Sequence, residues 1–195
     1  MKRYTIFFKI LSVSAIIFAS GCAYHLRYTI KSDFNQRVDI EQKGKTFAVE
    51  PRTAPDSANF QVESDLLHVI EQNLKDLGWI AVPANDAEYI FQVDFETENI
   101  KPEFGFGAFF GGDSGFYLFG QLNTGKSDYS NHFIKITAYE TDGERVYTWS
   151  ADITTGRVSQ DIKTLAVHMI PSALSRFPEQ GQWEMREKVH LHRKK

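Results

Sequence analysis

The sequence has very little cysteine: a single residue, Cys22, in a chain of 195. A disulfide framework needs cysteines in pairs, so none is expected. A zinc site needs three or four convergent ligands, and the two histidines near the end, His190 and His192, are too few without thiolates. An excess of basic residues is also lacking, because 22 Lys and Arg stand against 25 Asp and Glu. Nucleic-acid binding, which calls for a basic surface, is therefore excluded.

Long apolar runs are scarce as well. Residues 10–19 are uncharged and mostly apolar, and the segment before them carries Lys2, Arg3 and Lys9 but no acid. This order, charge first and apolar residues next, is typical of an export signal. A ten-residue helix is about 15 Å long, roughly half the thickness of a membrane's hydrocarbon core, so the run is too short for a permanent anchor.

The apolar run ends in residues 19–22, Ala-Ser-Gly-Cys, and small residues before a cut suit the narrow cleft of a signal peptidase. An ordinary signal peptide could end in this way, but the only cysteine of the chain stands at the cut site. The segment resembles the lipobox of bacterial lipoproteins. That resemblance implies diacylglycerol on the Cys22 sulfur, cleavage before Cys22 and acylation of the new amine, and several acyl chains anchor a protein stably. By resemblance to the sorting rule of Gram-negative lipoproteins, Ala23 favours the outer membrane, and we expect the protein to face the periplasm.

Two stretches have helical spacing. Leucine and isoleucine recur on one face of residues 62–77, and Gly78 follows at the place where helices often end. A second apolar stripe, residues 162–170, follows a candidate cap at Ser159. The sequence therefore predicts two helices, each with one apolar face.

Other stretches have the period of a strand. Residues 88–98 alternate between apolar and polar side chains, which indicates a half-buried strand. Strands are also expected over residues 45–50, 79–82, 131–140 and 145–154. The last two are joined by an Asp-Gly pair, a strong signal for a hairpin. We therefore predict an α+β fold, in which two helices pack on one face of a mostly antiparallel sheet of about four to six strands.

The chain is expected to hold one folded domain between two shorter segments. The predicted parts are a lipoprotein signal peptide (residues 1–21), a lipidated N-terminus with a tether and a first extended segment (22–44), the α+β domain (45–178) with a glycine/aromatic insertion (104–120), and a polar C-terminal tail (179–195). The domain is long enough to bury a core without disulfides or metals.

The order of several segments resembles one bacterial lipoprotein family, known only as domain of unknown function 4136. The segments are KTFAVEP, LKDLGW, AEYIFQVDFETE, a glycine-aromatic stretch, IKITAYETDGERVYTWSADI and a last helix closing in RFP. The resemblance covers residues 45–178 and implies an envelope lipoprotein with an α+β domain. It carries over no catalytic residue.

The most unusual segment, residues 104–120, combines aromatic residues with glycine. Its aromatic residues are Phe104, Phe106, Phe109, Phe110, Phe116, Tyr117 and Phe119, and its only charge is Asp113. Leaving so many aromatic side chains in water is costly, so something should cover them. Three interpretations stay open: a hairpin packed on its own domain, contact with the nearby bilayer surface, or contact with a partner protein in the envelope.

Three carboxylates, Asp94, Glu96 and Glu98, lie on the polar side of one predicted strand, about 6.6 Å apart at successive positions. They could bind a cation or act as an acid and base pair. The simpler interpretation is a solvated sheet face, with Lys135 as a candidate partner. The sequence also contains neither G-x-S-x-G nor H-E-x-x-H. We therefore expect no catalytic residue, no metal site and no cofactor.

The function predicted from the sequence is a binding function without catalysis. We expect an outer-membrane lipoprotein that serves as a periplasmic interaction or envelope-assembly module, with residues 104–120 as its contact surface. Its partners would be the membrane, through lipid on Cys22, and an envelope protein. The alternative is a nucleotide-binding protein or enzyme that uses residues 120–127, Gly-Gln-Leu-Asn-Thr-Gly-Lys-Ser, which formally match the phosphate-loop pattern.

We predict that the protein does not bind ATP tightly. A phosphate loop needs a helix directly after it, because the helix N-terminus completes the anion site, and residues 128–131 lead into a strand pattern instead. Isothermal titration calorimetry should detect no tight binding. Tight ATP binding that is abolished by Lys126→Ala would contradict the prediction and establish the alternative function.

Overall fold

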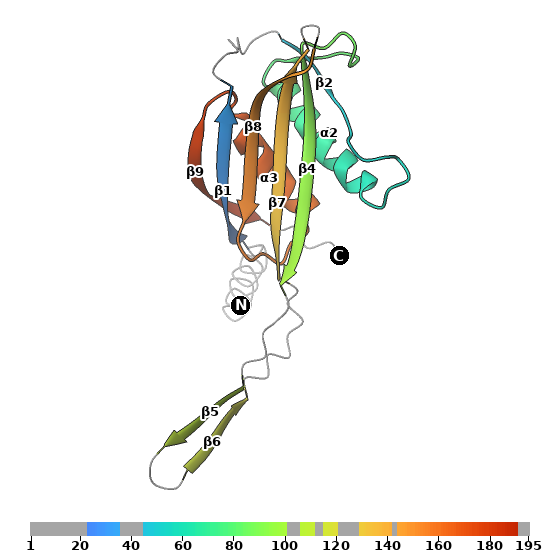
Figure 1. Cartoon of the computed structure of the whole chain (residues 1–195). Coiled ribbons are helices and arrows are strands. Elements are labelled where there is room, and N and C mark those ends of the chain that lie inside the picture. The colour runs from blue at the N-terminus through green and yellow to red at the C-terminus, as the bar shows by residue number, and fades with distance from the viewer. Residues whose placement is uncertain are drawn as a thin grey trace, which may run out of the picture.

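The computed structural model describes residues 23–35, 45–100, 106–111, 115–120, 129–141 and 144–190 (Figure 1). Its strands are β1 (Ala23–Phe34), β2 (Thr46–Val49), β3 (Ile80–Ala81), β4 (Tyr89–Ile100), β5 (Phe106–Gly111), β6 (Gly115–Gly120), β7 (Tyr129–Glu140), β8 (Val146–Thr155) and β9 (Gly181–His190). Its helices are α2 (Phe60–Asp76) and α3 (Ile162–Leu174). Neither of these helices is long and apolar enough to cross a membrane.

The main sheet has seven strands in the order β3-β2-β4-β7-β8-β1-β9. β2 runs parallel to both β3 and β4, and the other neighbours are antiparallel. The prediction of a mostly antiparallel sheet of about four to six strands is therefore wrong, although the fold is α+β. One reason is the connection from β2 through α2 to β3, which is a crossover connection and therefore makes β2 and β3 parallel. The other is that β1 and β9 add two strands at the opposite side.

Both helices cover the same face of the main sheet, behind it in the view of Figure 1. The helix predicted over residues 62–77 is α2, whose apolar face buries Leu66, Ile70 and Leu74 against the sheet. α3 begins after Asp161, whose carboxylate accepts a hydrogen bond from the Thr164 N–H at 2.9 Å. The expected cap at Ser159 is therefore wrong, because a carboxylate two residues later satisfies the first turn.

An aromatic cluster centred on Phe177, which follows α3, fills the space between the helices and the sheet. The centroid of its ring lies 5.1 Å from the Trp149 ring and 5.6 Å from the Trp79 ring. The rings of Tyr89 and Phe91 lie 6.4 and 5.9 Å away. Most of these pairs meet edge to face, which aromatic rings prefer. The cluster therefore joins the end of the last helix to β4, to β8 and to the residue before β3.

Residues 22–44 were predicted to hold a lipidated N-terminus, a tether and a first extended segment; in the structure, Ala23–Phe34 form β1, an interior strand. It pairs with β8 on one side and with β9 on the other. Its alternate residues Leu26, Tyr28 and Ile30 are buried in the core, so the segment has the period of a half-buried strand. Residues 36–44 lie outside the described residues.

β9 occupies most of the polar tail expected over residues 179–195. One face of β9 is exposed and carries only polar or charged side chains, which on their own resemble a solvated tail. On the other face, Trp183 and Met185 pack against the core and Val189 is buried in it. The apolar positions on this inner face fall two or four residues apart, as a strand requires, so residues 181–190 form a strand and not the expected polar tail.

Replacing Phe177 should destabilise the domain strongly. Phe177 is 6 % exposed and contacts four other aromatic rings, so Phe177→Ala leaves a cavity that the surrounding strands cannot close. We expect a loss of about 3–5 kcal/mol in the free energy of unfolding, measured by urea titration. Val167→Ala, at a half-exposed position of α3, is the control and should change it by less than about 0.5 kcal/mol. Equal effects of the two substitutions would contradict the role of the cluster.

Candidate functional site

Five strand ends meet at one edge of the main sheet. They are Ala23 of β1, Ile100 of β4, Tyr129 of β7, Thr155 of β8 and His190 of β9. We call this end of the sheet, where strands start or finish, the lower edge, after its place in Figure 1. It is distinct from the edge strands β3 and β9. Antiparallel pairing brings the ends together, because Ala23 lies opposite His190 and Ile100 lies opposite Tyr129. The lower edge therefore receives the start of the described chain and also the base of the glycine/aromatic insertion.

Cys22, the predicted lipidation site, lies outside the described residues but directly precedes β1. β1 starts at Ala23, so no described linker separates the cysteine from the sheet. A lipid on Cys22 would therefore attach the lower edge to the membrane with almost no slack. The lipid modification of Cys22 is a prediction from the sequence.

The glycine/aromatic insertion contains a two-stranded ribbon, formed by β5 and β6, that hydrogen-bonds to no strand of the main sheet. Six of the seven predicted contact residues lie in it, namely Phe106, Phe109, Phe110, Phe116, Tyr117 and Phe119; Phe104 lies outside the described residues. Phe109 is opposite Tyr117, and Phe110 is opposite Phe116. The register therefore pairs aromatic residues at two successive positions of the ribbon.

The phosphate-loop pattern begins at Gly120, the last residue of β6, and the rest of it lies outside the described residues. The element that follows is β7, a strand that starts at Tyr129. A phosphate loop leads into a helix, whose N-terminal N–H groups bind the anion. The following strand therefore favours a coincidental match.

Two of the three carboxylates of β4, Asp94 and Glu98, have separate partners among the described residues. Asp94 forms an ion pair with Arg52, not with Lys135, which instead lies 3.8 Å from Asp152. The Glu98 carboxylate accepts a hydrogen bond from the Asn131 side chain at 3.1 Å. No group of three or more metal-ligating side chains occurs among the described residues. This arrangement fits a solvated sheet face better than a cation site.

His132 is the one buried histidine of the described chain, and it was not singled out from the sequence. It is 3 % exposed, and its Nε2 donates to the carbonyl oxygen of Gln160 at 2.8 Å. Its Nδ1 lies 2.9 Å from the Thr97 hydroxyl, which donates to it in that tautomer. Both ring nitrogens are thus occupied, so His132 ties β4 and β7 to the loop before α3. A histidine in this state is not free to act as a base or a metal ligand.

A serine, a histidine and a glutamate also lie close together beside α3. His168 Nδ1 contacts the Glu187 carboxylate at 3.0 Å. Ser172 is not bonded to that ring: its hydroxyl donates to the His168 carbonyl oxygen at 3.3 Å and accepts from the Tyr28 hydroxyl at 2.8 Å. Nucleophilic catalysis would need a hydrogen bond between the serine hydroxyl and a ring nitrogen of the histidine. The group therefore fastens α3 to β1 and β9.

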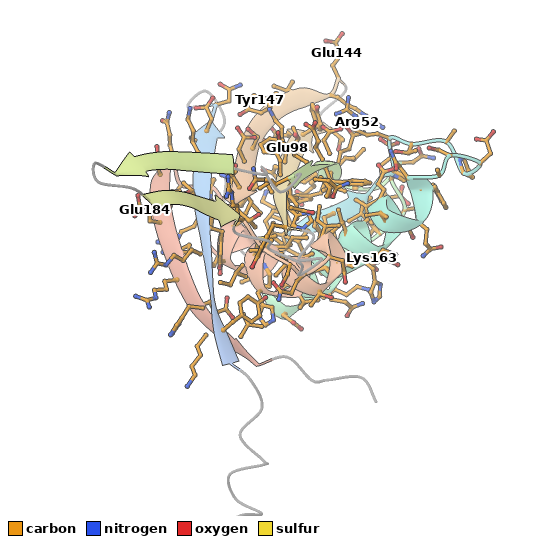
Figure 2. All side chains as sticks on the ribbon, turned by 90° about the horizontal axis from the view of Figure 1, so that it is seen from below. Arg52, Glu98, Glu144, Tyr147, Lys163 and Glu184 are labelled. Atoms are coloured by element: carbon orange, nitrogen blue, oxygen red, sulfur yellow. The ribbon has the colours of Figure 1, made fainter. Side chains whose placement is uncertain are left out.

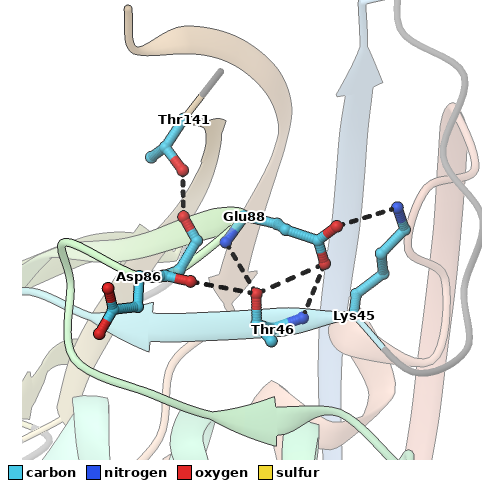
Figure 3. Close-up of polar contacts among 6 residues, drawn as sticks. Lys45, Thr46, Asp86, Glu88 and Thr141 are labelled. Carbon is cyan, nitrogen blue, oxygen red and sulfur yellow. Dashed lines mark hydrogen bonds and ion pairs between the residues drawn. The ribbon is translucent and has the colours of Figure 1, made fainter. Parts of the chain in front are cut away.

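Glu88 stands at a surface hollow of about 400 Å³ at the opposite edge of the sheet. Figure 3 shows its carboxylate accepting from the Thr46 N–H at 2.9 Å and contacting Lys45 Nζ at 3.4 Å. The Thr46 hydroxyl accepts in turn from the Glu88 N–H at 3.0 Å. The hydrogen bond from the Thr46 N–H, aided by Lys45, holds the pKa of Glu88 below its ordinary value. The hydrogen bonds of Glu88 thus join β2 to the start of β4.

A family model described as "Domain of unknown function (DUF4136)" matches residues 30–179. The match confirms the resemblance seen over residues 45–178 and extends it into β1. No curated protein sequence matches the chain.

Among solved structures, a PDZ domain protein from Parabacteroides distasonis ATCC 8503 superposes with a TM-score of 0.56 at 14% identity. The superposition covers 90% of this chain and 42% of that one, so the chain spans less than half of that protein's length. A PelC dodecamer from Paraburkholderia phytofirmans, in two crystal forms, gives TM-scores of 0.42 and 0.43 at 16% identity and covers 76% of this chain and 95% of its own. At these identities, the first likeness shows a shared fold, and the second is too weak to support an argument.

Removing the charge of Glu88 should destabilise the protein in a pH-dependent way. A lowered pKa in the folded state contributes stability that is present above the ordinary glutamate pKa and is lost as the pH falls through the folded value. Glu88→Gln should therefore cost about 0.5–1 kcal/mol at neutral pH, a small figure because the side chain is half exposed, and much less in acid. Urea unfolding across pH measures this. Glu144→Gln, at an exposed carboxylate labelled in Figure 2, is the control; a pH-independent effect of Glu88→Gln would contradict this role of Glu88.

Proposed function

The chain belongs to the family known as domain of unknown function 4136, and on that premise we propose that it is an outer-membrane lipoprotein that acts by binding a periplasmic partner. Cys22 carries the lipid, and the β5–β6 ribbon is the contact surface. The observation that carries the proposal is that, among the described strands, β5 and β6 pair only with each other, and that the ribbon is inserted at the same edge of the sheet at which β1 begins.

An isolated two-stranded ribbon needs a partner. Such a hairpin is marginally stable in water unless a hydrophobic face packs against something. The twelve residues of β5 and β6 include six aromatic residues and no charged residue, so the ribbon is poorly suited to water. Because neither strand joins the main sheet, a self-packed hairpin gains no support from strand pairing. A surface outside the domain is the better candidate for covering the ribbon.

A protein is a better partner than the bilayer interior. A ribbon of two strands has two open edges, and each edge presents backbone N–H and C=O groups without partners. Hydrocarbon cannot satisfy those groups, so open sheet edges do not occur inside a membrane. A partner protein can add a strand to an edge and cover the aromatic residues with apolar side chains. The proposed partner is therefore an envelope protein with an apolar surface and an available strand edge.

Lipid on Cys22 would determine where that partner is met. A strand rises by about 3.3 Å per residue, so a lipid on Cys22 lies within a few ångströms of the lower edge. The ribbon is inserted between Ile100 and Tyr129, at that same edge. The partner would thus be bound near the membrane surface, and the sheet would serve as a rigid mount rather than as an enzyme.

Photocrosslinking in living cells tests the proposal. A benzophenone amino acid at Phe109, and separately at Phe116, should give a discrete protein adduct when Cys22 is intact. The same probe at Val167, an exposed position of α3, is the matched control and should give none. Adducts to lipid alone, or no adduct at either ribbon position, would overturn the partner assignment.

The anchor is tested separately. Mass spectrometry of the purified protein should find acyl chains on Cys22, and Cys22→Ser should remove them and release the protein from the membrane fraction. An unmodified Cys22 would overturn the lipoprotein assignment, whatever the ribbon contacts.

A further inference from the structure

Four basic side chains lie together on the face of the sheet that the helices leave open. On β1 they are His25 and Arg27, and on β9 they are Arg186 and Lys188; all four are exposed. Lys188 is directly opposite His25, and Arg186 is directly opposite Arg27. We call these four residues the cationic margin, because they line the β1–β9 side of the sheet where it reaches the lower edge.

In the part of the chain that the structure describes, most Lys and Arg side chains outside the cationic margin form ion pairs, whereas those of the margin form none. Within the described residues, the Lys and Arg side chains in ion pairs are Lys45, Arg52, Lys75, Lys135, Arg145, Lys163 and Arg176. Those for which no ion pair occurs in that part of the chain are Arg27, Lys31, Arg157, Arg186 and Lys188. All but one of the second group lie on β1 and β9. The unpaired cations are therefore concentrated on one side of the sheet.

The close placement of these basic side chains does not stabilise the folded protein. Like charges directly opposite each other destabilise a strand pair, and Arg27 faces Arg186 in this way. The nearest acid on the same face is Glu184, which is opposite Thr29 in the adjacent register position. Glu187 belongs to the other face, where it contacts His168. An external anion would reduce the repulsion between Arg27 and Arg186.

The distance of the cationic margin from Cys22 indicates which anion it would meet. His25 is three residues from Cys22, a distance of about 10 Å along a strand, and Arg27 is about 17 Å away. A lipid on Cys22 would hold the cationic margin close to a surface of phosphate head groups. Electrostatic attraction acts over about 8 Å at physiological salt, so the margin can reach that surface only if the β1–β9 side leans toward it.

The opposite side of the same face has the opposite charge. Asp94, Glu96 and Glu98 lie on β4, and only Asp94 has a cationic partner among the described residues. An anionic surface would attract the β1–β9 side and repel the β4 side. The tilt that results turns the base of the ribbon, at Ile100 and Tyr129, away from the head groups and toward a protein partner.

We infer that the cationic margin binds the phosphate groups of an anionic membrane and sets the tilt of the anchored domain. The inference rests on the proposed anchoring through Cys22 for its location. Binding itself needs no lipid on the protein, so the two ideas can fail separately.

Vesicle flotation tests the inference with the chain from residue 22 onward carrying Cys22→Ser, which retains every described helix and strand. It should float with vesicles that contain phosphatidylglycerol, should not float with pure phosphatidylcholine, and should be released by salt. Each basic residue near such a surface contributes about five-fold, so Arg27→Gln with Arg186→Gln should lower the partition about 25-fold. Equal binding to both vesicles, or binding that salt does not weaken, would overturn the inference.

Two control variants make the result specific. Lys75→Gln with Lys163→Gln removes the same charge from the helical side of the molecule, where Figure 2 shows Lys163 far from Glu184 of β9, and should leave flotation unchanged. Replacing Arg193, Lys194 and Lys195 by Gln should leave most of the binding. If the tail variant abolishes flotation while the arginine variant retains it, the strands are not the site. The arginine variant should melt no lower than the parent, since it removes a like-charge pair.

Discussion

The pairing of β1 on both of its sides is the constraint on which the rest of the structure depends. β1 lies between β8 and β9, so the first described residues of the chain are held by hydrogen bonds from two neighbours. Its inward side chains Leu26, Tyr28 and Ile30 belong to the same core as the helices. Whatever is attached just before Ala23 is therefore attached to the folded domain without a flexible spacer. Because this attachment is rigid, a lipid on Cys22 would hold the ribbon and the cationic margin at defined distances from a membrane.

Local periodicity was enough to predict the middle of the fold but not its two sides. α2, β4 and the β7–β8 hairpin were found because apolar spacing, a terminal glycine and an Asp-Gly turn all act within a few residues. β9 was missed because Glu187 interrupts its inner apolar face, and it becomes a strand through pairing with β1, which is more than 140 residues away in sequence. The parallel direction of β2 is likewise decided by the packing of α2, which short-range pattern does not report.

The part of the candidate site that is marked by its amino-acid composition could be predicted from the sequence. Aromatic residues at high density among glycines indicated the contact segment, and the structure adds that the described part is a ribbon paired only with itself. The cationic margin could not be predicted, because Arg27 and Arg186 become neighbours only through strand register. The phosphate-loop pattern shows the converse: eight residues matched a motif, but the element after them, β7, is of the wrong kind.

The polar groups of the domain favour binding over catalysis. A catalytic base or nucleophile needs a lone pair that is not already used by the fold. His132 has a partner on each ring nitrogen, and the Ser172 hydroxyl is bonded on both sides. Glu63, which is 1 % exposed, accepts hydrogen bonds from the backbone N–H groups of Arg52 and Thr53. By contrast, charges that the fold leaves uncompensated lie on the open face of the sheet, basic on β1 and β9 and acidic on β4. Among the described residues, the side chains that could act in catalysis are thus engaged by the fold, whereas charges without partners occur on the open face of the sheet, and this distribution supports the proposed binding function.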